Sequence, residues 1–352
     1  MVKALKKFSM KKCCMILLFS LYFGQCSEMA ENNYDPHTID IYQRDTFIDI
    51  DKTFYNESLN RPVLVRENPA TKEIIVLDHG NNCIYFFSQK GDFLRKVGQR
   101  GQGPGDLSYP EYLAVDSDGS IYVYEFFNKR ISIFSRDGIF ESFFRISLPR
   151  NPQFFITKDK KILVRVANSN YYITVFGKNG EIIKEIGEIQ HFNDKLKKIN
   201  ILYNDCICFE NNDGDYVVFL KHLPIVKVYD KDGNLKIEKE LYDELRTKEI
   251  HNPKSMSENI MYIIYYQEIV YRDSNYYLFR GYNRDVRDRN KVIVNVLDDN
   301  FVNVKNIFLP LQEKYNIDEF GFDMKCDVSH NLDFIIMPFT QYSEIHKFYP
   351  KN

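Results

Sequence analysis

The chain has 352 residues, of which 44% are hydrophobic and 27% charged. That composition provides for a sizeable core and excludes wholesale disorder. Phe and Tyr alone make up the 15% aromatic fraction, and aromatic enrichment favours β-strands over helices. A formal net charge of −2 argues against electrostatic nucleic-acid binding, so we expect no nucleic-acid partner.

The N-terminus has the pattern of an export signal. Five lysines between Lys3 and Lys12 precede an apolar run from Met15 to Phe23, which has the length of a signal-peptide core. The run is too short to span a bilayer as a stable helix. Met10 is a second plausible start that would shorten the basic region.

Cys26 closes this segment. Phe23–Cys26 resembles a loose lipobox, in which the cysteine becomes a lipidated N-terminus, although the family pattern prefers a small residue where Gln25 stands. The alternative is an uncleaved or differently cleaved signal with Cys26 as an ordinary thiol. We therefore predict a lipoprotein signal peptide over residues 1–25, a flexible tether over 26–38, and a folded domain over 39–352.

Four cysteines fall inside the predicted folded domain. Cys83, Cys206, Cys208 and Cys326 form no C-x-x-C pair and have no zinc spacing. Cys206 and Cys208 would share one face of a strand, where they cannot easily bridge each other. We expect all four to be buried free thiols.

The folded region repeats one pattern, an alternating apolar strand followed by a polar turn that usually contains Gly. We predict the φ > 0 turn position to be Gly or Asn. The copies are Ile84–Gly91, Ile131–Gly138, Ile173–Gly180, Val226–Gly233 and, more weakly, Val292–Asn300.

A second strand series precedes each of these copies and adds a sixth. Its members are Glu73–Leu77, Ser120–Tyr124, Lys161–Arg165, Asp215–Phe219, Asn275–Phe279 and Leu332–Ile336. Copies spaced 40–70 residues apart predict sheets arranged as repeated blades.

The sixth copy suggests how the repeats close. Glu344–Pro350 aligns with the first series but is followed by no outer strand, whereas Thr46–Ile50 is a spare strand at the other end. An N-terminal strand that completes the last blade would cover the open edges. We therefore predict an all-β fold, a six-bladed β-propeller with four-stranded antiparallel blades and a ring closed by an N-terminal strand.

One stretch resembles the NHL repeat. Val97–Leu107 contains G-x-G-x-G-P-G, and Asp118–Val123 and Asn128–Ile131 follow as its two strands, with Glu125 where the family usually has Asp. Because a strand follows, Gly101, Gly103 and Gly105 form a tight backbone turn and not a nucleotide loop. The whole chain also resembles six-bladed propeller lipoproteins of Bacteroidetes. This implies an exported, membrane-anchored protein, periplasmic or at the cell surface of a Gram-negative bacterium.

We place function on the propeller face that carries the long links, because variable loops on a rigid scaffold carry binding sites. The candidate ligand-binding residues are Arg280, Tyr282, Arg284, Arg287 and Glu125. Arginine forks suit carboxylates or phosphates, and tyrosine faces suit sugars or peptide side chains. The alternative is that the loop's Arg–Asp pairs neutralise one another at the surface and bind nothing.

The resemblance also implies a metal alternative. His79 and His222 follow equivalent strands of the first and fourth repeats, and some NHL-like enzymes bind a metal through imidazoles on this face. Asp78, Glu125 and Asp285 could add carboxylates for calcium. A zinc- or calcium-dependent hydrolase or lyase at the channel mouth is thus the alternative function.

No nucleophile motif is present, so the sequence favours a binding protein over an enzyme but does not exclude an enzyme. The leading expectation is an envelope-tethered binding or scaffolding module. It needs no cofactor, acts as a monomeric propeller, and recognises a peptide, protein or glycan on its long-link face.

Overall fold

The computed structural model divides the chain into a unit over Met1–Thr38 and a unit over Ile39–Asn352. It describes residues 39–49, 58–150, 152–166, 169–191, 197–241, 266–280, 291–310, 325–331, 333–337 and 344–350. The predicted signal, Cys26 and the tether therefore lie outside the described residues. Across the described ranges, no helix is long and apolar enough to cross a membrane.

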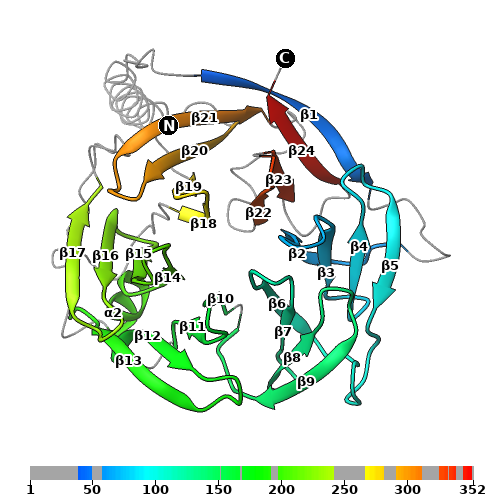
Figure 1. Ribbon diagram of the computed structural model, residues 1–352, viewed down its shortest axis with the longest axis horizontal. Helices are drawn as coiled ribbons and strands as arrows, with labels where there is room; N and C mark the ends of the chain where they lie inside the picture. Colours follow the sequence, from blue (N-terminus) through cyan, green and yellow to red (C-terminus); the bar gives the residue numbers. More distant parts are fainter. Residues whose placement is uncertain are drawn as a thin grey trace, which may run out of the picture. The chain divides into compact units, whose positions relative to one another are not determined.

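The second unit is built of β-sheets around a central axis (Figure 1). Four sheets have four strands each, and their strands follow one another in chain order. These are β2 (Pro62–Glu67), β3 (Ile74–Asp78), β4 (Cys83–Phe87) and β5 (Phe93–Val97); β6 (Pro110–Val115), β7 (Ile121–Glu125), β8 (Arg130–Phe134) and β9 (Phe140–Arg145); β10 (Phe154–Ile156), β11 (Ile162–Val164), β12 (Tyr171–Phe176) and β13 (Ile182–Glu188); and β14 (Cys206–Glu210), β15 (Tyr216–Leu220), β16 (Ile225–Tyr229) and β17 (Leu235–Glu240). A short helix, α2 (Lys197–Tyr203), precedes β14.

The fifth sheet has eight strands in the order β18-β19-β20-β21-β1-β24-β23-β22. They are β18 (Tyr266–Arg272), β19 (Asn275–Arg280), β20 (Lys291–Asp298), β21 (Asn303–Pro310), β1 (Ile39–Asp49), β24 (Glu344–Pro350), β23 (Phe334–Met337) and β22 (Lys325–Val328). β1 pairs antiparallel with β24, from Tyr42–Pro350 to Asp49–Glu344, and its first residues pair parallel with β21. The sheet thus holds two antiparallel series joined by a parallel pairing.

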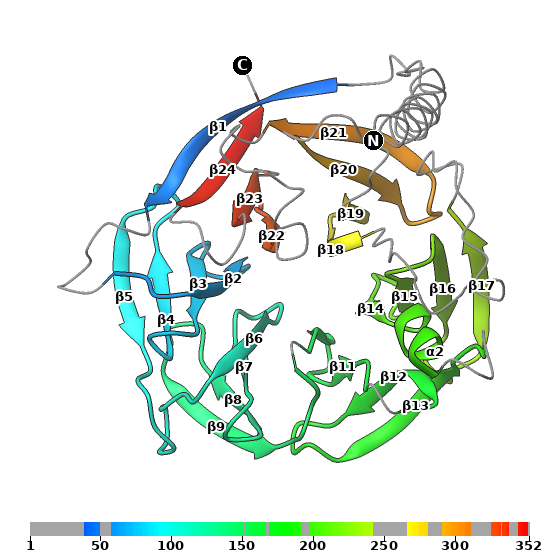
Figure 2. The ribbon, with the colours of Figure 1, turned by 180° about the vertical axis from the view of Figure 1, so that it is seen from behind.

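The strands nearest the axis form a closed series of contacts. β2 contacts β6, and contacts continue through β10, β14, β18 and β22 back to β2. Figures 1 and 2 show these strands around the axis from its two sides. The prediction of an all-β propeller with four-stranded antiparallel blades is confirmed, and the strands of both repeat series lie in the second and third positions of the sheets.

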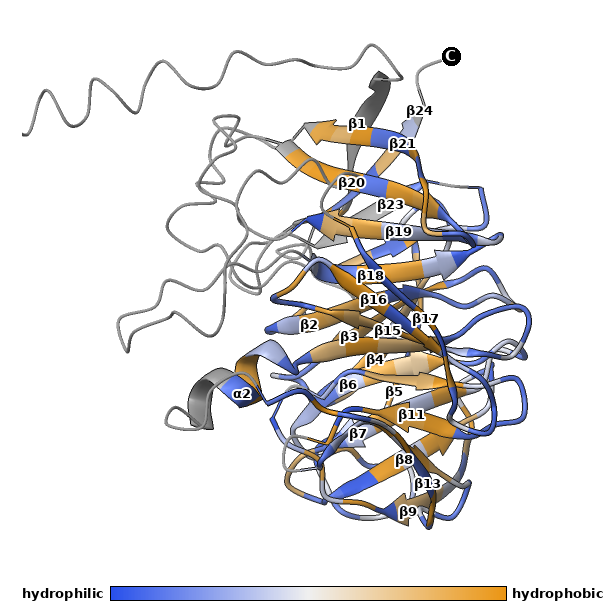
Figure 3. Ribbon diagram, turned by 90° about the vertical axis from the view of Figure 1, so that its left-hand side faces the viewer, coloured by the Kyte–Doolittle hydropathy of each residue, from blue (hydrophilic) through white to orange (hydrophobic). Residues whose placement is uncertain are grey.

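The core lies between the sheets. β3, β7 and β15 are buried along their whole length, whereas the outer strand β5 alternates between half-buried and exposed residues. Figure 3 shows the same pattern as apolar strands between polar turns. Strands covered on both faces read as continuous hydrophobic runs, which explains why the second and third strands were recognisable in the sequence. The four predicted thiols, Cys83, Cys206, Cys208 and Cys326, are buried and are not in disulfides.

The hairpin turns confirm the glycine prediction in four copies and correct it in the fifth. Gly91, Gly138, Gly180 and Gly233 have φ between 84° and 94°. In the fifth turn the residue at positive φ (58°) is Phe301, and not Asn300 as predicted. Phe301 N–H bonds the Asp298 carbonyl, as Gly233 N–H bonds that of Asp230. The buried Phe301 ring stacks on Tyr276 at 5.3 Å between centroids, and this packing offsets an unfavourable backbone conformation.

Candidate functional site

A cavity of about 290 Å³ lies among the strands nearest the axis. Its walls come from β2, β6, β10, β14, β18 and β22, and it extends to the short turns that follow the first strand of several sheets, at Pro69, Ser117 and Asn212. The sequence had placed function on the opposite face, where the long links lie. The volume is just below the usual range of small-molecule sites, roughly 300–1,000 Å³.

Arg66 and Glu268 form a buried ion pair across this cavity. Arg66 Nη2 lies 3.1 Å from Glu268 Oε1, and the two side chains are 14% and 3% exposed. Arg66 also donates to the carbonyls of Val65 and Cys326 and to the Tyr112 hydroxyl. Both terminal nitrogens of the guanidinium are therefore engaged by acceptors of the protein itself.

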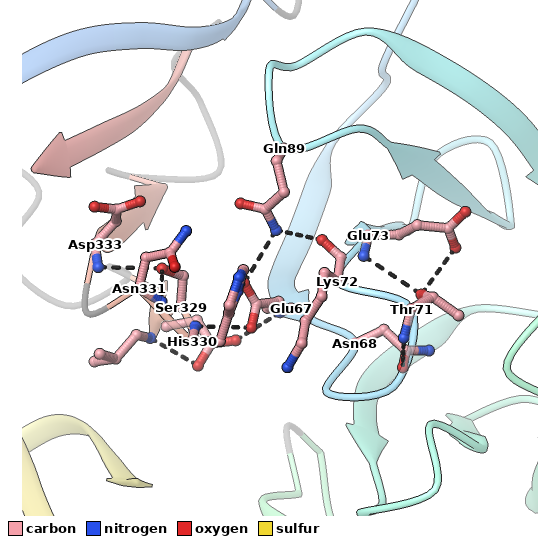
Figure 4. Close-up of polar contacts among 12 residues, drawn as sticks. Glu67, Asn68, Thr71, Lys72, Glu73, Gln89, Ser329, His330, Asn331 and Asp333 are labelled. Carbon is pink, nitrogen blue, oxygen red and sulfur yellow. Dashed lines mark hydrogen bonds and ion pairs between the residues drawn. The ribbon is translucent and has the colours of Figure 1, made fainter. Parts of the chain in front are cut away.

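Glu67 gathers a second group of polar side chains beside the cavity (Figure 4). Its oxygens lie 3.1 Å from Arg272 Nη1 and 2.9 Å from His330 Nδ1, and Gln89 donates to Oε2 at 3.0 Å. The Glu67 side chain is fully buried. A buried carboxylate with this many donors is held in one position.

Asp327 links the two groups. Its Oδ2 accepts from the Glu67 backbone N–H at 2.7 Å, and its Oδ1 accepts from the Val328 N–H. Burial raises the pKa of Asp327, while the nearby Arg66 and Arg272 act in the opposite direction. Burial also raises the pKa of Tyr112 to about 12, so its hydroxyl stays protonated at neutral pH.

Two acceptor oxygens on residues that line this cavity have no hydrogen-bond partner. They are Glu268 Oε2 and Gln153 Oε1, from β18 and from the residue just before β10. Glu268 is 2% exposed, and its second oxygen accepts no hydrogen bond from the protein. An unpaired buried acceptor costs about 1–3 kcal/mol, which is unusual for a group without a role.

Glu125, a predicted ligand-binding residue, has a structural role. Its carboxylate is fully buried and accepts from Arg130 Nε at 2.6 Å, Ser132 Oγ at 2.5 Å and the Ser108 N–H at 2.9 Å. Arg130 in turn donates to the carbonyls of Gln102, Gly103 and Asp106, which belong to the glycine-rich turn. The pair thus fastens that turn to β7 and β8.

The two predicted metal ligands also lie in separate packing environments. The buried His79 places Nδ1 3.1 Å from the Pro110 carbonyl and its ring edge against Tyr109, and burial lowers the pKa of His79. His222 packs against Tyr203 of α2. Asp78 accepts from the N–H groups of Asn60 and Asn81. Within the ranges given above, no group of three His, Cys, Asp or Glu side chains could hold a metal ion.

The predicted arginine loop is described only at its first residue. Arg280 ends β19 and donates to Asn295 Oδ1 at 3.3 Å. Tyr282, Arg284, Asp285 and Arg287 lie outside the described residues, so their role stays a prediction.

Sequence reasoning missed Arg66, Glu67, Glu268 and Asp327. They lie on the first strands of their sheets, and the repeat search had found only the second and third strands. A signal was available for Arg66 and Glu67, which directly follow the apolar run Val63–Val65. A charge within a strand that faces a propeller axis is a candidate site residue.

Comparison with known proteins supports the fold. A family model described as a 6-bladed beta-propeller matches residues 63–196, which is less than half of the chain. Protein brain tumor of Drosophila melanogaster is 28% identical over 124 residues, covering 35% of this chain. The chain spans only 12% of the length of that relative.

Solved structures share the architecture at low identity. A protein of Bacteroides fragilis described as exported superimposes with a TM-score of 0.57 at 12% identity, over 91% of this chain and 98% of that one. An inactive variant of virginiamycin B lyase from Staphylococcus aureus, solved with quinupristin, gives 0.51 at 11% identity over 88% and 100%. These likenesses concern the fold, and together with the sheet order they make this chain a β-propeller.

Proposed function

We propose that this β-propeller is a binding module whose ligand enters the cavity on its axis. The observation that supports this most is a cavity between buried strands whose lining includes buried polar side chains from several sheets. Its volume suits a small molecule or the end of a peptide or glycan, and not a globular surface. Because buried strands already hold the lining residues in place, little conformational entropy would be lost when a ligand binds.

Filling the cavity tests this proposal. Ala114 lines it and is almost buried, so Ala114→Phe should occupy the space without adding charge. We expect ligands found by thermal shift in a mixed set of amines, sugars, carboxylates and short peptides to raise the Tm of the wild type but not of the variant. Ala70→Phe, on a turn outside the lining, is the matched control. Equal shifts in wild type and Ala114→Phe, or no binding at all, would overturn the proposal.

We further propose that the eight-stranded sheet comprises two blades, so that the ring has six blades and β1 closes it. Seven residue pairs join β1 to β24 in support, at about 0.5–1.5 kcal/mol for each net hydrogen bond. Removing residues 1–51 should then lower the free energy of unfolding by several kcal/mol, whereas removing residues 1–36 should leave it unchanged. Equal melting of the two truncated chains would contradict closure by β1.

The expected anchor at Cys26 belongs to the same proposal, since it would place the propeller at a membrane surface. Fractionation of cells that express the wild type or Cys26→Ala tests it. The wild type should sediment with membranes, and the variant should appear in the soluble exported fraction. A wild type that is soluble would remove the anchor.

A further inference from the structure

We infer that the axial cavity takes the charged donor end of its ligand, a primary ammonium group, between Glu268 Oε2 and Gln153 Oε1. The inference rests on the proposed function and names the ligand chemistry of the same site. An ammonium group carries three donors and no acceptor, which matches two open acceptor oxygens.

Glu268 is held for this role by its neighbours. Arg66 engages Oε1 at 3.1 Å, which fixes the carboxylate and leaves Oε2 without a partner. Arg66 uses only Oε1 of this carboxylate as its counter-charge, and its other acceptors are two carbonyls and a hydroxyl. The open oxygen is the part of the pair that the fold does not use.

The charges around the cavity favour a cation. Its described lining contains five carboxylates (Glu67, Asp116, Glu210, Glu268 and Asp327) and three basic side chains (Arg66, Lys158 and Arg272). Arg66 and Arg272 are paired with Glu268 and Glu67, and Lys158 Nζ, at the exposed end, donates to the Asn212 carbonyl. An anionic ligand would therefore meet an acidic wall in a low-dielectric site, whereas a cation would neutralise part of it.

A bare metal ion fits less well than an ammonium group. Divalent cations need several converging oxygen or nitrogen ligands, and the described lining brings no such set of three together. Two acceptors from different sheets, one charged and one neutral, are instead typical of a site that directs N–H donors.

The test uses the full-length chain and two matched pairs of probes in isothermal titration calorimetry at pH 7. The first pair is the N-terminally acetylated tripeptide Gly-Lys-Gly and its acetyllysine counterpart, so that only the lysine side chain carries a primary ammonium group, and the second is glucosamine and N-acetylglucosamine. We expect at least one amine to bind, and its acetylated partner to bind about 10- to 100-fold more weakly, the value of a charge-assisted hydrogen bond. The amine that binds tells whether the group comes from a peptide lysine or from an amino sugar.

Variants assign the binding to the two oxygens. Glu268→Gln should weaken binding of that amine at least tenfold, and Gln153→Met, which removes one carbonyl oxygen without changing charge, should weaken it about threefold or more. Glu141→Gln, the same change on an exposed position of β9, should leave the affinity unchanged. If Glu268→Gln fails to fold, Gln153→Met alone still decides.

Three results would overturn the inference. The first is equal affinity of an amine and its acetylated partner, and the second is unchanged affinity in both Glu268→Gln and Gln153→Met. The third is that neither amine binds while a neutral or anionic ligand binds the wild type but not Ala114→Phe. The last result leaves the proposed function standing and removes only the ammonium. Absence of every ligand removes both.

Discussion

Two buried arginine–glutamate pairs, chemically alike, have different surroundings in this molecule. Glu125 and Arg130 face each other on adjacent strands of one sheet, and three further donors reach the carboxylate. Glu268 and Arg66 join two different sheets across the axial cavity, and one carboxylate oxygen has no partner. The first pair is closed and holds a loop, while the second is open toward a cavity. Burial of an ion pair therefore does not by itself say whether it serves structure or binding.

The largest expected effect is on the closed pair. Glu125→Leu leaves Arg130 buried without its counter-charge, and we expect a loss of about 3–5 kcal/mol in the free energy of unfolding. Urea denaturation followed by circular dichroism measures it, with Glu141→Leu on the exposed face of β9 as control. A loss below about 1 kcal/mol would mean that the pair does not hold the glycine-rich turn.

The open pair should tolerate change better. Glu268→Gln keeps an acceptor for Arg66, which also has three other acceptors, so we expect a loss of only about 1–2 kcal/mol. The same denaturation experiment compares it with Glu125→Gln, the matched substitution in the closed pair. If Glu268→Gln costs as much as Glu125→Gln, the distinction between open and closed pairs fails.

A finer change sharpens the description of the closed pair. Ser132→Ala removes one donor, 2.5 Å from Glu125 Oε1, and leaves the ion pair in place. We expect a loss of about 1 kcal/mol, the net value of one hydrogen bond. Ser142→Ala on the exposed part of β9 is the control, and equal stability of the two variants would show that Ser132 adds nothing to the pair.

The smallest expected effect on stability concerns His79. Like the Glu125–Arg130 pair, its Nδ1 has a partner within the protein, the Pro110 carbonyl. Burial lowers its pKa, so below about pH 6.5 the unfolded chain binds more protons than the folded one. This contribution is present above that pH and is lost as the pH falls toward the folded-state pKa. Relative to His79→Gln, the wild type should lose up to about 1 kcal/mol between pH 7.5 and 5.5 in denaturation curves. Parallel stability–pH profiles of the wild type and His79→Gln would contradict this prediction.

The sequence predicted more of the fold than of the candidate site. The second and third strands of each sheet were predicted because burial on both faces gives them long apolar runs, as in Ile74–Leu77. The first strands vary in length, from three residues in β10 to seven in β18, and some carry charges such as Arg66 and Glu268, so they share no pattern that repeats visibly. Glu125 was predicted as a ligand-binding residue, whereas its contacts with Ser132 and Arg130 depend on strand register and could not be read from spacing alone.

The candidate site depends on contacts between distant parts of the chain. Arg66 of β2 and Glu268 of β18 are brought together only when the two strands face the same axis. Phe301 illustrates the same limit locally, because its positive φ is tolerated through stacking on Tyr276, and no turn preference predicts that.

The pairing of β1 with β24 has a consequence for the order of folding. Thr46 lies opposite His346, so this ladder joins segments 300 positions apart. Contacts of such long range form slowly, and this one has no partner strand until ribosomal synthesis has passed residue 350. Residues Tyr42–Asp49 therefore lack their antiparallel partner while the four-stranded sheets are made, which leaves an unpaired strand edge available to chaperones or to a neighbouring copy during that interval.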